Sequence, residues 1–538
     1  MKAFSIFLLA VAAGVFVPSA AVASLTAPSE VEQWDLIELT LEGPSEGNPF
    51  LEVRISATFS DGFQSKVVDG FYDGDGVYRI RFMPDRTGTW TYVTHSNRSR
   101  LTNRQGRFTV TPAGEGNHGP VGVYQTFHFA YADGTPYFPV GTTAYNWLHR
   151  NDRLRTETID TLAQSPFNKV RMLLYPEDEK GRPLPPEFPF EGTDPRAREW
   201  DFERFNPAFF RRIEEGILAL RDLGIEADVI LFHKYGEDWG FESMDVETDD
   251  RYLKYVVARL AAFRNVWWSV ANEWDFVRTK TMADWDRYFE ILRDKDPYGR
   301  LRSIHNGFRM YDHNKDWVTH VSIQNGAAVE ESGRAQMYRD VYEKPVVYDE
   351  VKYEGDLVQR WGNLSAEEMV HRFWAGTVAG TYVGHGECYQ HPTREIWLTT
   401  GGVLRGESPS RIAFLRDILE SVPGRVNPID KWQDPTAGGV HGEHYLVYFG
   451  REAPAEWPFR LFRRGVAEGQ EYAVEIIDTW NMTITPVEGT FVVTREDGYH
   501  FVDREGRSVE LPGKPYHALR IRRVGGDSVF AAEELPLL

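Results

Sequence analysis

The sequence contains one cysteine, Cys388, so the chain cannot form a disulfide of its own. It also lacks any long basic run, and 80 acidic against 60 basic side chains give a formal charge of −20 at pH 7. An acidic surface repels phosphate backbones and anionic lipids, which argues against nucleic-acid and membrane-surface partners. Hydrophobic cores must therefore stabilise the fold, and 538 residues at 42% hydrophobic content are enough to build them.

The N-terminus carries an apolar run that reads as a targeting segment. Lys2 precedes the run over residues 4–17, and residues 21–23 (Ala-Val-Ala) offer a small-x-small cleavage site. The run is too short to span a bilayer, and no Lys/Arg cluster follows it. We predict a signal peptide over residues 1–23, export to the periplasm or the extracellular space, and no membrane insertion after cleavage.

Strand, turn and helix patterns divide the remaining chain into three parts. Residues 24–115 and 425–525 alternate short strand-like runs with Gly- or Pro-containing turns, which is typical of antiparallel sandwiches. Residues 123–424 instead alternate short apolar strands with amphipathic helices. The eight strands expected there cover residues 137–141, 169–174, 226–232, 266–271, 301–305, 320–324, 346–349 and 381–384.

Eight strands predict the fold class: an α/β (β/α)₈ TIM barrel flanked by N-terminal and C-terminal antiparallel β-sandwich domains. A doubly wound nucleotide-binding sheet is the rival, but it would show a Gly-rich phosphate turn after its first strand, and residues 141–144 (Gly-Thr-Thr-Ala) are not one. Residues 73–76 (Asp-Gly-Asp-Gly) resemble the start of a calcium loop. They lack the Glu that closes an EF-hand, so we predict a hairpin turn there.

Two carboxylates stand just past strands of the expected barrel. Glu273 follows the fourth strand and Glu350 ends the seventh. Reacting groups of such barrels lie at the C-terminal ends of strands, and two carboxylates across one barrel mouth are the equipment for glycoside hydrolysis. One must stay protonated near neutral pH and the other ionised. Asp349 and Glu354 are rivals of Glu350, and Glu387 is a reserve candidate; since successive strand residues face opposite ways, Asp349 and Glu350 should not both face one sugar.

These motifs resemble the clan A retaining glycoside hydrolases, a cellulase-like and apiosidase-like group of TIM barrels. The resemblance implies that Glu273 is the acid/base and Glu350 the nucleophile. It further implies that Arg171, on the second strand, lies beside the nucleophile. His233 and Asn272 occupy positions where the family contacts the sugar 2-hydroxyl or orients a carboxylate.

The flanking parts add to the resemblance. Residues 31–34, 70–74 and 81–84 (Val-Glu-Gln-Trp, Gly-Phe-Tyr-Asp-Gly and Arg-Phe-Met-Pro) look like a domain of unknown function found ahead of such barrels. Residues 475–481 (Glu-Ile-Ile-Asp-Thr-Trp-Asn) resemble a small sandwich that often follows them and is named for collagen binding. The resemblance thus covers nearly the whole mature chain, although its motifs do not specify a substrate.

Aromatic residues make up 14% of the chain, more than a core needs, and several fall on the predicted rim. Aromatics on loop after loop at one rim suggest sugar-stacking surfaces. The candidates for substrate contacts are Tyr145, Trp147, Trp274, Tyr353 and Trp397, together with the polar His385 and Glu387. The last two share a loop with Cys388 and His391, but without a zinc-binding frame we predict sugar contacts there and no metal.

The sequence therefore predicts an exported retaining glycoside hydrolase that acts on a poly- or oligosaccharide and needs no cofactor. The sugar, the linkage, internal or terminal cleavage, and the oligomeric state stay open. The alternative is a carbohydrate- or matrix-binding protein with a catalytically silent barrel. A glycosyl-transferring enzyme that uses the same carboxylates is a third possibility.

Overall fold

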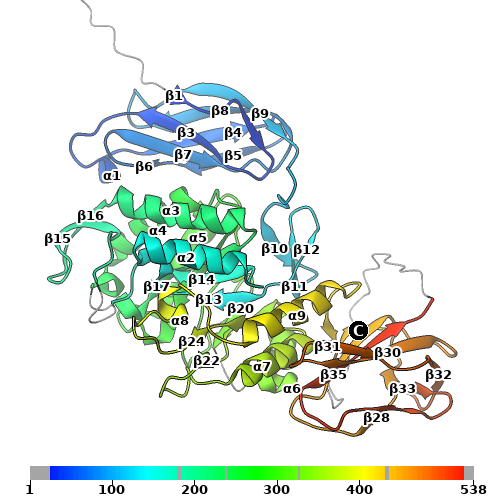
Figure 1. Ribbon diagram of the computed structural model, residues 1–538. Helices are drawn as coiled ribbons and strands as arrows, with labels where there is room; N and C mark the ends of the chain where they lie inside the picture. Colours follow the sequence, from blue (N-terminus) through cyan, green and yellow to red (C-terminus); the bar gives the residue numbers. More distant parts are fainter. Residues whose placement is uncertain (1–24, 179–182, 237–238, 325–327, 430–435, 526–538) are drawn as a thin grey trace, which may run out of the picture.

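The computed structural model describes residues 25–178, 183–236, 239–324, 328–429 and 436–525, so the expected signal peptide lies outside the described residues. The largest hydrophobic core belongs to the central barrel, and a separate core lies in each flanking part. Figure 1 shows the N-terminal sandwich above the barrel and the C-terminal strands beside it. Within the described residues, no helix combines the length and the apolar character that crossing a membrane would require.

The centre of the chain forms the expected eight-stranded parallel barrel. In spatial order its strands are β19 (Arg302–Ser303), β18 (Val266–Asn272), β17 (Glu226–His233), β14 (Lys169–Leu173), β13 (Gly141–Thr143), β23 (Tyr382–His385), β21 (Val346–Glu350) and β20 (Val321–Gln324). Every neighbouring pair is parallel. An isolated parallel bridge between His305 and Ser322 joins the edge strands β19 and β20 and closes the barrel.

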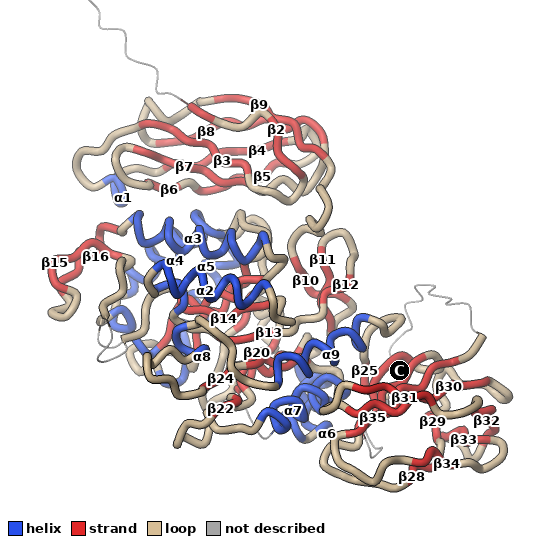
Figure 2. The backbone as a smooth tube through the Cα atoms, viewed as in Figure 1, coloured by secondary structure: helices blue, strands red, loops and turns tan. Residues whose placement is uncertain are grey.

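Amphipathic helices cover the outside of the barrel (Figure 2). They are α2 (Asp152–Ala163), α3 (Pro207–Asp222), α4 (Val246–Leu260), α5 (Met282–Lys295), α6 (Ser332–Tyr342), α7 (Ala366–Val378), α8 (Trp397–Thr400) and α9 (Ser408–Glu420). Side-chain N-caps begin five of them: Asn151, Asn206, Asp245, Thr281 and Ser365 each accept a backbone N–H. The rim loops contain the hairpin of β15 (Phe190–Asp194) and β16 (Glu199–Phe205), and the short parallel pair of β22 (Glu354–Gly355) and β24 (Glu387–Cys388).

The first barrel strand begins later than the sequence predicted. Its expected first residue lies in β12 (Pro136–Tyr137), which pairs with β11 (His128–Tyr131), itself paired with β10 (Val121–Tyr124). Phe129 of this sheet packs on Trp267 and Tyr382, with ring centroids 5.2 and 5.3 Å apart, at the N-terminal ends of their strands. The hairpin thereby fills the N-terminal end of the barrel with hydrophobic side chains.

The N-terminal part is a two-sheet sandwich. One sheet contains β1 (Leu25–Thr26), β3 (Ile37–Glu42), β7 (Val77–Phe82) and β6 (Phe71–Tyr72); the other contains β2 (Glu30–Glu32), β9 (Gln105–Thr111), β8 (Gly88–Ser96), β4 (Ile55–Ser60) and β5 (Ser65–Asp69). The short helix α1 (Pro49–Glu52) lies between β3 and β4. Residues 73–76 form the predicted hairpin turn between β6 and β7, in which Asp73 N donates to Val77 O over 2.8 Å.

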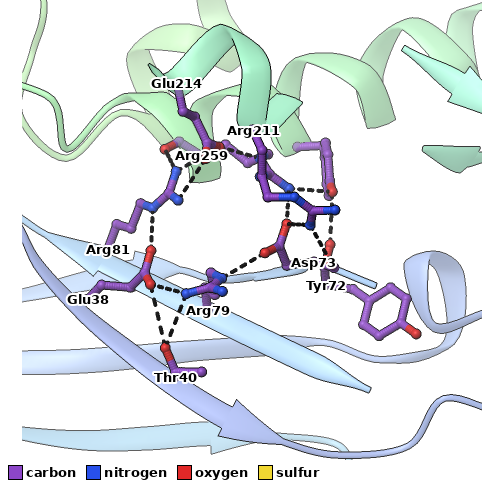
Figure 3. A network of polar contacts seen from close by, with 10 residues as sticks. Glu38, Thr40, Tyr72, Asp73, Arg79, Arg81, Arg211, Glu214 and Arg259 are labelled. Carbon is purple, nitrogen blue, oxygen red and sulfur yellow. Dashed lines mark hydrogen bonds and ion pairs between the residues drawn. The ribbon is translucent and has the colours of Figure 1, made fainter. Parts of the chain in front are cut away.

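Buried charges attach this sandwich to the barrel (Figure 3). Arg81 of β7 donates to Glu214 of α3 over 2.9 Å, and Arg259 of α4 donates to the same carboxylate over 2.6 Å. Arg259 also reaches Asp73, at 2.9 Å. All four side chains are buried. A buried charge is tolerated only when it is paired, so these groups fix the sandwich to helices α3 and α4.

The C-terminal part is antiparallel, with its own core. Its large sheet contains β25 (Asn427–Pro428), β26 (Thr436–Val440), β27 (His444–Tyr448), β35 (His517–Arg523), β30 (Glu471–Asp478), β32 (Phe491–Arg495), β33 (His500–Asp503) and β29 (Arg460–Phe462), with β31 (Thr483–Pro486) paired to β30. A two-stranded sheet of β28 (Glu456–Pro458) and β34 (Ser508–Glu510) accompanies it. Arg451 ties this part to the barrel through Glu368, at 2.5 Å, and Glu330, at 2.7 Å.

Candidate active site

The two predicted carboxylates lie at the C-terminal ends of their strands. Glu350 is the last residue of β21, and Glu273 directly follows β18 with a left-handed backbone (φ 48°). A non-glycine residue in this region is strained, and such strain gathers at functional sites. Glu350 is 6% exposed and Glu273 8%, so both carboxylates are largely removed from water.

Hydrogen-bond donors surround Glu350. Arg171 Nη1 lies 3.0 Å from Glu350 Oε1, the Tyr145 hydroxyl donates to the same oxygen, and His305 Nε2 lies 3.4 Å from it. Burial by itself would raise the pKa of Glu350, but His305, Arg171 and the Tyr145 hydroxyl together hold it below its ordinary value. Glu350 is therefore ionised near neutral pH.

Glu273 has a different environment. It accepts a hydrogen bond from the Tyr235 hydroxyl, and the Gln324 amide nitrogen, in the orientation that satisfies its hydrogen bonds, lies 3.2 Å from Glu273 Oε1. Burial raises the pKa of Glu273, and the negative charge of Glu350 raises it further. The site thus contains one carboxylate that favours the proton and one that favours the charge.

Arg171 connects the two halves of the site. While Nη1 contacts Glu350, Nη2 donates to Asn272 Oδ1 over 2.8 Å, next to Glu273 in the chain. The Asn272 side chain is fully buried, and its Nδ2 has no hydrogen-bond partner among the described residues. The arginine, which is always charged, thus fixes the amide beside one carboxylate and holds the other directly.

Asp349, an alternative candidate for the nucleophile, is held by other side chains of the barrel. Asp349 lies deeper in the barrel, where Lys169 Nζ at 2.8 Å and Ser322 Oγ at 2.5 Å contact its carboxylate. The register shifts between β20 and β21, so that Ser322 pairs with Val347 but Gln324 with Glu350. This bulge breaks the alternation of side chains, and Arg171 is within 4.0 Å of both Asp349 and Glu350. The premise of simple alternation is therefore wrong, but the prediction drawn from it holds in that Glu350 borders the open space and Asp349 does not.

The other two candidate carboxylates, Glu354 and Glu387, bind the backbone just before and at the start of α9. Glu354 is fully buried and accepts hydrogen bonds from the backbone N–H groups of Glu407 and Ser408, at 2.8 and 3.3 Å. Glu387 accepts from the backbone of Arg405 and Gly406, at 2.6 and 2.8 Å. Both oxygens of Glu387 thus face protein donors at the start of α9, which corrects the predicted sugar contact. Burial raises the pKa of Glu387 to about 7.

His385 and His233 are also withdrawn from the cleft, and both are fully buried. His385 Nδ1 lies 3.0 Å from Thr142 Oγ1, and its ring stacks on Phe167. His233 Nε2 lies 3.0 Å from Tyr175 O. Burial lowers the pKa of both imidazoles to about 3, so they are neutral. Their predicted sugar contacts are corrected to packing roles.

The five predicted stacking aromatics are buried, with at most 6% exposure. Trp147 and Trp397, at 1%, lie in the core, and Trp397 Nε1 donates to Thr142 Oγ1. Trp274 packs edge-on against Tyr311. Trp147 and Trp397 do not present an open face, so the prediction of stacking is wrong for them, while for Trp274, at 5% exposure, it stays a prediction. Tyr145 and Tyr353 do reach the site, but through their hydroxyl groups, which interact with Glu350.

The open space beside Glu350 is a cavity of about 480 Å³. Two exposed aromatics line it, Phe308 at 81% and Trp361 at 45%. Both lie in rim loops, after β19 and β21 respectively, and the sequence analysis missed them along with Tyr235, His305 and Gln324. Short loops have no periodicity that could have marked these residues; their position after barrel strands was the only available signal.

Comparison with known families assigns the barrel to a family. The apiosidase-like catalytic domain family matches residues 125–398, about half of the chain and the whole barrel up to the rim loop after β23. The chain belongs to the apiosidase-like family and is a glycoside hydrolase. Domains of unknown function match on either side of it, DUF5060 at residues 30–97 and DUF5605 at residues 432–522. The alternative of a silent barrel is thereby set aside.

One solved structure with high identity gives the same result. A "putative glycoside hydrolase" from Bacteroides vulgatus ATCC 8482 is 43% identical, with a TM-score of 0.90, and the match covers 92% of this chain and 100% of that one. A family 39 glycoside hydrolase from Bacteroides cellulosilyticus WH2 matches at 9% identity over 93% and 100% of the two chains, with a TM-score of 0.42. An endo-β-1,4-mannanase from Thermotoga petrophila matches at 11% identity over 70% and 92%, with a TM-score of 0.39. Similarity as low as in these last two says nothing about substrate. No curated protein matches the chain significantly.

Proposed function

We propose that this apiosidase-like enzyme hydrolyses O-glycosidic bonds of a poly- or oligosaccharide with retention of configuration. In the first step a Glu350 oxygen forms a bond to the anomeric carbon while the glycosidic C–O bond breaks, and Glu273 gives its proton to the leaving oxygen. In the second step Glu273 takes a proton from water, whose oxygen replaces Glu350 at the anomeric carbon.

The observation that supports this mechanism is the opposite environment of the two acids. Arg171 and Tyr145 stabilise the ionised form of Glu350, as a nucleophile requires. Burial and the charge of Glu350 raise the pKa of Glu273, which is the direction that a general acid requires. A glycosyl-transferring enzyme would share the first step and differ only in the acceptor.

The stereochemistry of the first product tests the mechanism. We expect ¹H NMR of a running reaction to show the substrate's own anomeric configuration before mutarotation. The Glu350→Ala variant should lose hydrolysis, and added azide should restore turnover and give a glycosyl azide of inverted configuration. An inverted first product from the wild-type enzyme, or full activity in Glu350→Ala, would contradict the assignment.

We also propose that the protein is exported, since the N-terminal apolar run and the Ala-Val-Ala site have the form of a signal peptide. Mass spectrometry of the protein recovered outside the cytoplasm should show a chain that begins at residue 24. A full-length chain retained in the cytoplasm would contradict export.

A further inference from the structure

Two positive side chains line the cavity beside Glu350 without a counter-charge. Lys352 and Arg360 both border it, and neither forms an ion pair with any residue in the described ranges. Arg372, in the same cavity, is different because it pairs with Glu330. On a chain with a formal charge of −20, these two cations make the rim of the cavity beside Glu350 locally positive.

The backbone at Lys352 is strained. Lys352 has φ 67°, two residues after Glu350. A left-handed conformation costs an L-residue other than Gly, Asn or Asp about 1–2 kcal/mol. Glycine would remove that cost but would also remove the ammonium group from the cavity.

The two exposed aromatic rings at the cavity are held in place. The Asp275 carboxylate accepts three backbone N–H bonds from residues 307–309, at 2.6, 2.8 and 2.8 Å, and so fixes the loop that carries Phe308. The Trp361 carbonyl accepts from Tyr353 N over 2.7 Å, and the two rings pack edge to face. Rigid, exposed rings provide stacking faces at little entropic cost.

We propose that this part of the cleft is a subsite for a sugar bearing a negative charge, a carboxylate or a sulfate group. Phe308 and Trp361 offer apolar faces to the ring, and Lys352 and Arg360 bind the anionic substituent. Arginine matches a carboxylate or sulfate with two parallel N–H donors, whereas lysine acts as a point charge. The inference deepens the proposed function, because it names the class of substrate that the same site accepts.

Matched substrates test the subsite. Glucuronate- and galacturonate-containing oligosaccharides form one arm, each beside its carboxyl-reduced counterpart; sulfated oligosaccharides and their desulfated forms make the second arm. We expect KM for one anionic arm to be at least about 10-fold below that of its neutral partner, the size of a charged hydrogen bond. That preference should weaken as NaCl screens the charges.

The variants are Lys352→Asn, in which Asn tolerates the left-handed backbone without the charge, and Arg360→Gln. Each should raise KM for the anionic substrate about 10-fold, with little change in kcat and no change for the neutral partner. Arg198→Asn is the control, since it removes one positive charge from another left-handed position (φ 60°) that does not line the cavity. It should leave both constants unchanged.

Binding is measured separately from catalysis. Isothermal titration of the Glu350→Ala variant with the same oligosaccharide pairs should show tighter binding of the anionic member, and Lys352→Asn in that background should remove the difference. The subsite proposal would be wrong if charged and neutral oligosaccharides bound equally well, or if none of the anionic oligosaccharides bound. The anomeric configuration of the product is independent of this result, so failure of the mechanism and failure of the subsite are distinguishable.

Discussion

Arg171 Nη1 donates to Glu350 Oε1 over 3.0 Å from inside the barrel, and this contact places a permanent positive charge against the nucleophile. The guanidinium lowers the pKa of Glu350, so its removal should raise that pKa. Activity requires ionised Glu350 and is lost as pH falls through its pKa. In Arg171→Met the acidic limb of the kcat/KM profile should therefore move to higher pH.

Arg171→Lys is the matched variant, because it keeps the charge but loses the two-way contact with Glu350 and Asn272. Its acidic limb should lie between those of the wild type and Arg171→Met. An unchanged acidic limb in a folded Arg171→Met protein would show that Arg171 does not lower the pKa of Glu350.

Tyr235 should affect the basic limb of the kcat/KM profile. Its hydroxyl donates to Glu273 and stabilises the carboxylate, which lowers the pKa that burial and Glu350 have raised. Tyr235→Phe should raise the pKa of Glu273 further, and the basic limb, where the acid loses its proton, should move to higher pH. Tyr311→Phe is the control, because its hydroxyl contacts Asp286 outside the cleft. An unchanged basic limb in Tyr235→Phe would show that the ionisation of Glu273 does not produce this limb.

Glu273→Gln removes the acid but keeps the shape of the side chain. We expect kcat to fall by about 10²–10⁴-fold on natural glycosides, the range for loss of general acid catalysis. Aryl glycosides with a low leaving-group pKa need no protonation, so their first step should be much less affected. Equal losses on both kinds of substrate would contradict the acid role.

Buried ion pairs below the site should stabilise the barrel. Lys169 Nζ lies 2.6 Å from Asp228 and 2.8 Å from Asp349, and all three side chains are 1% exposed. Lys169→Met leaves two buried acids without their partner, which should lower the free energy of unfolding by about 3–5 kcal/mol. Lys66→Met removes the partly exposed pair with Asp85 and should cost about 0–1 kcal/mol. Chemical unfolding followed by tryptophan fluorescence compares the two.

The stacking faces can be tested without a charged substrate. Trp361→Ala should raise KM about 2- to 12-fold, which corresponds to the 0.5–1.5 kcal/mol of an aromatic contact. The control is Phe63→Ala, since Phe63 is 85% exposed in the N-terminal sandwich, away from the cleft. A KM that Trp361→Ala leaves unchanged would remove Trp361 from the sugar-binding surface.

The periodicity of apolar residues in the sequence was sufficient to predict the fold. Eight apolar runs, separated by amphipathic helices, predicted the strands of the barrel, because helix and strand periods are local properties. The boundary at residues 137–141 was wrong, since Pro136–Tyr137 satisfies the same apolar pattern while pairing in a separate hairpin. Local pattern does not reveal which partner a short strand takes.

The site was accessible to sequence reasoning only in part. Placement at strand ends singled out Glu273 and Glu350, since strand ends meet at one rim, whereas Arg171, inside its strand, came from the family resemblance alone. Burial was not predictable: Trp397 and Glu387 share the rim position, yet one packs in the core and the other binds the start of α9. The bulge that turns Glu350 inward depends on the register of β20 against β21, which no local pattern specifies.

The arginine–carboxylate contacts between the N-terminal sandwich and the barrel bear on how such chains recombine. Glu214 and Arg259 belong to barrel helices, but Arg81 and Asp73, which neutralise them, belong to the sandwich. A gene fusion that exchanged the sandwich alone would remove Arg81 from Glu214 and Asp73 from Arg259, and would leave these two buried barrel residues only each other as charged partners among the described residues. An exchanged sandwich would therefore have to supply an arginine and an acid at the same two places to match the charges of helices α3 and α4.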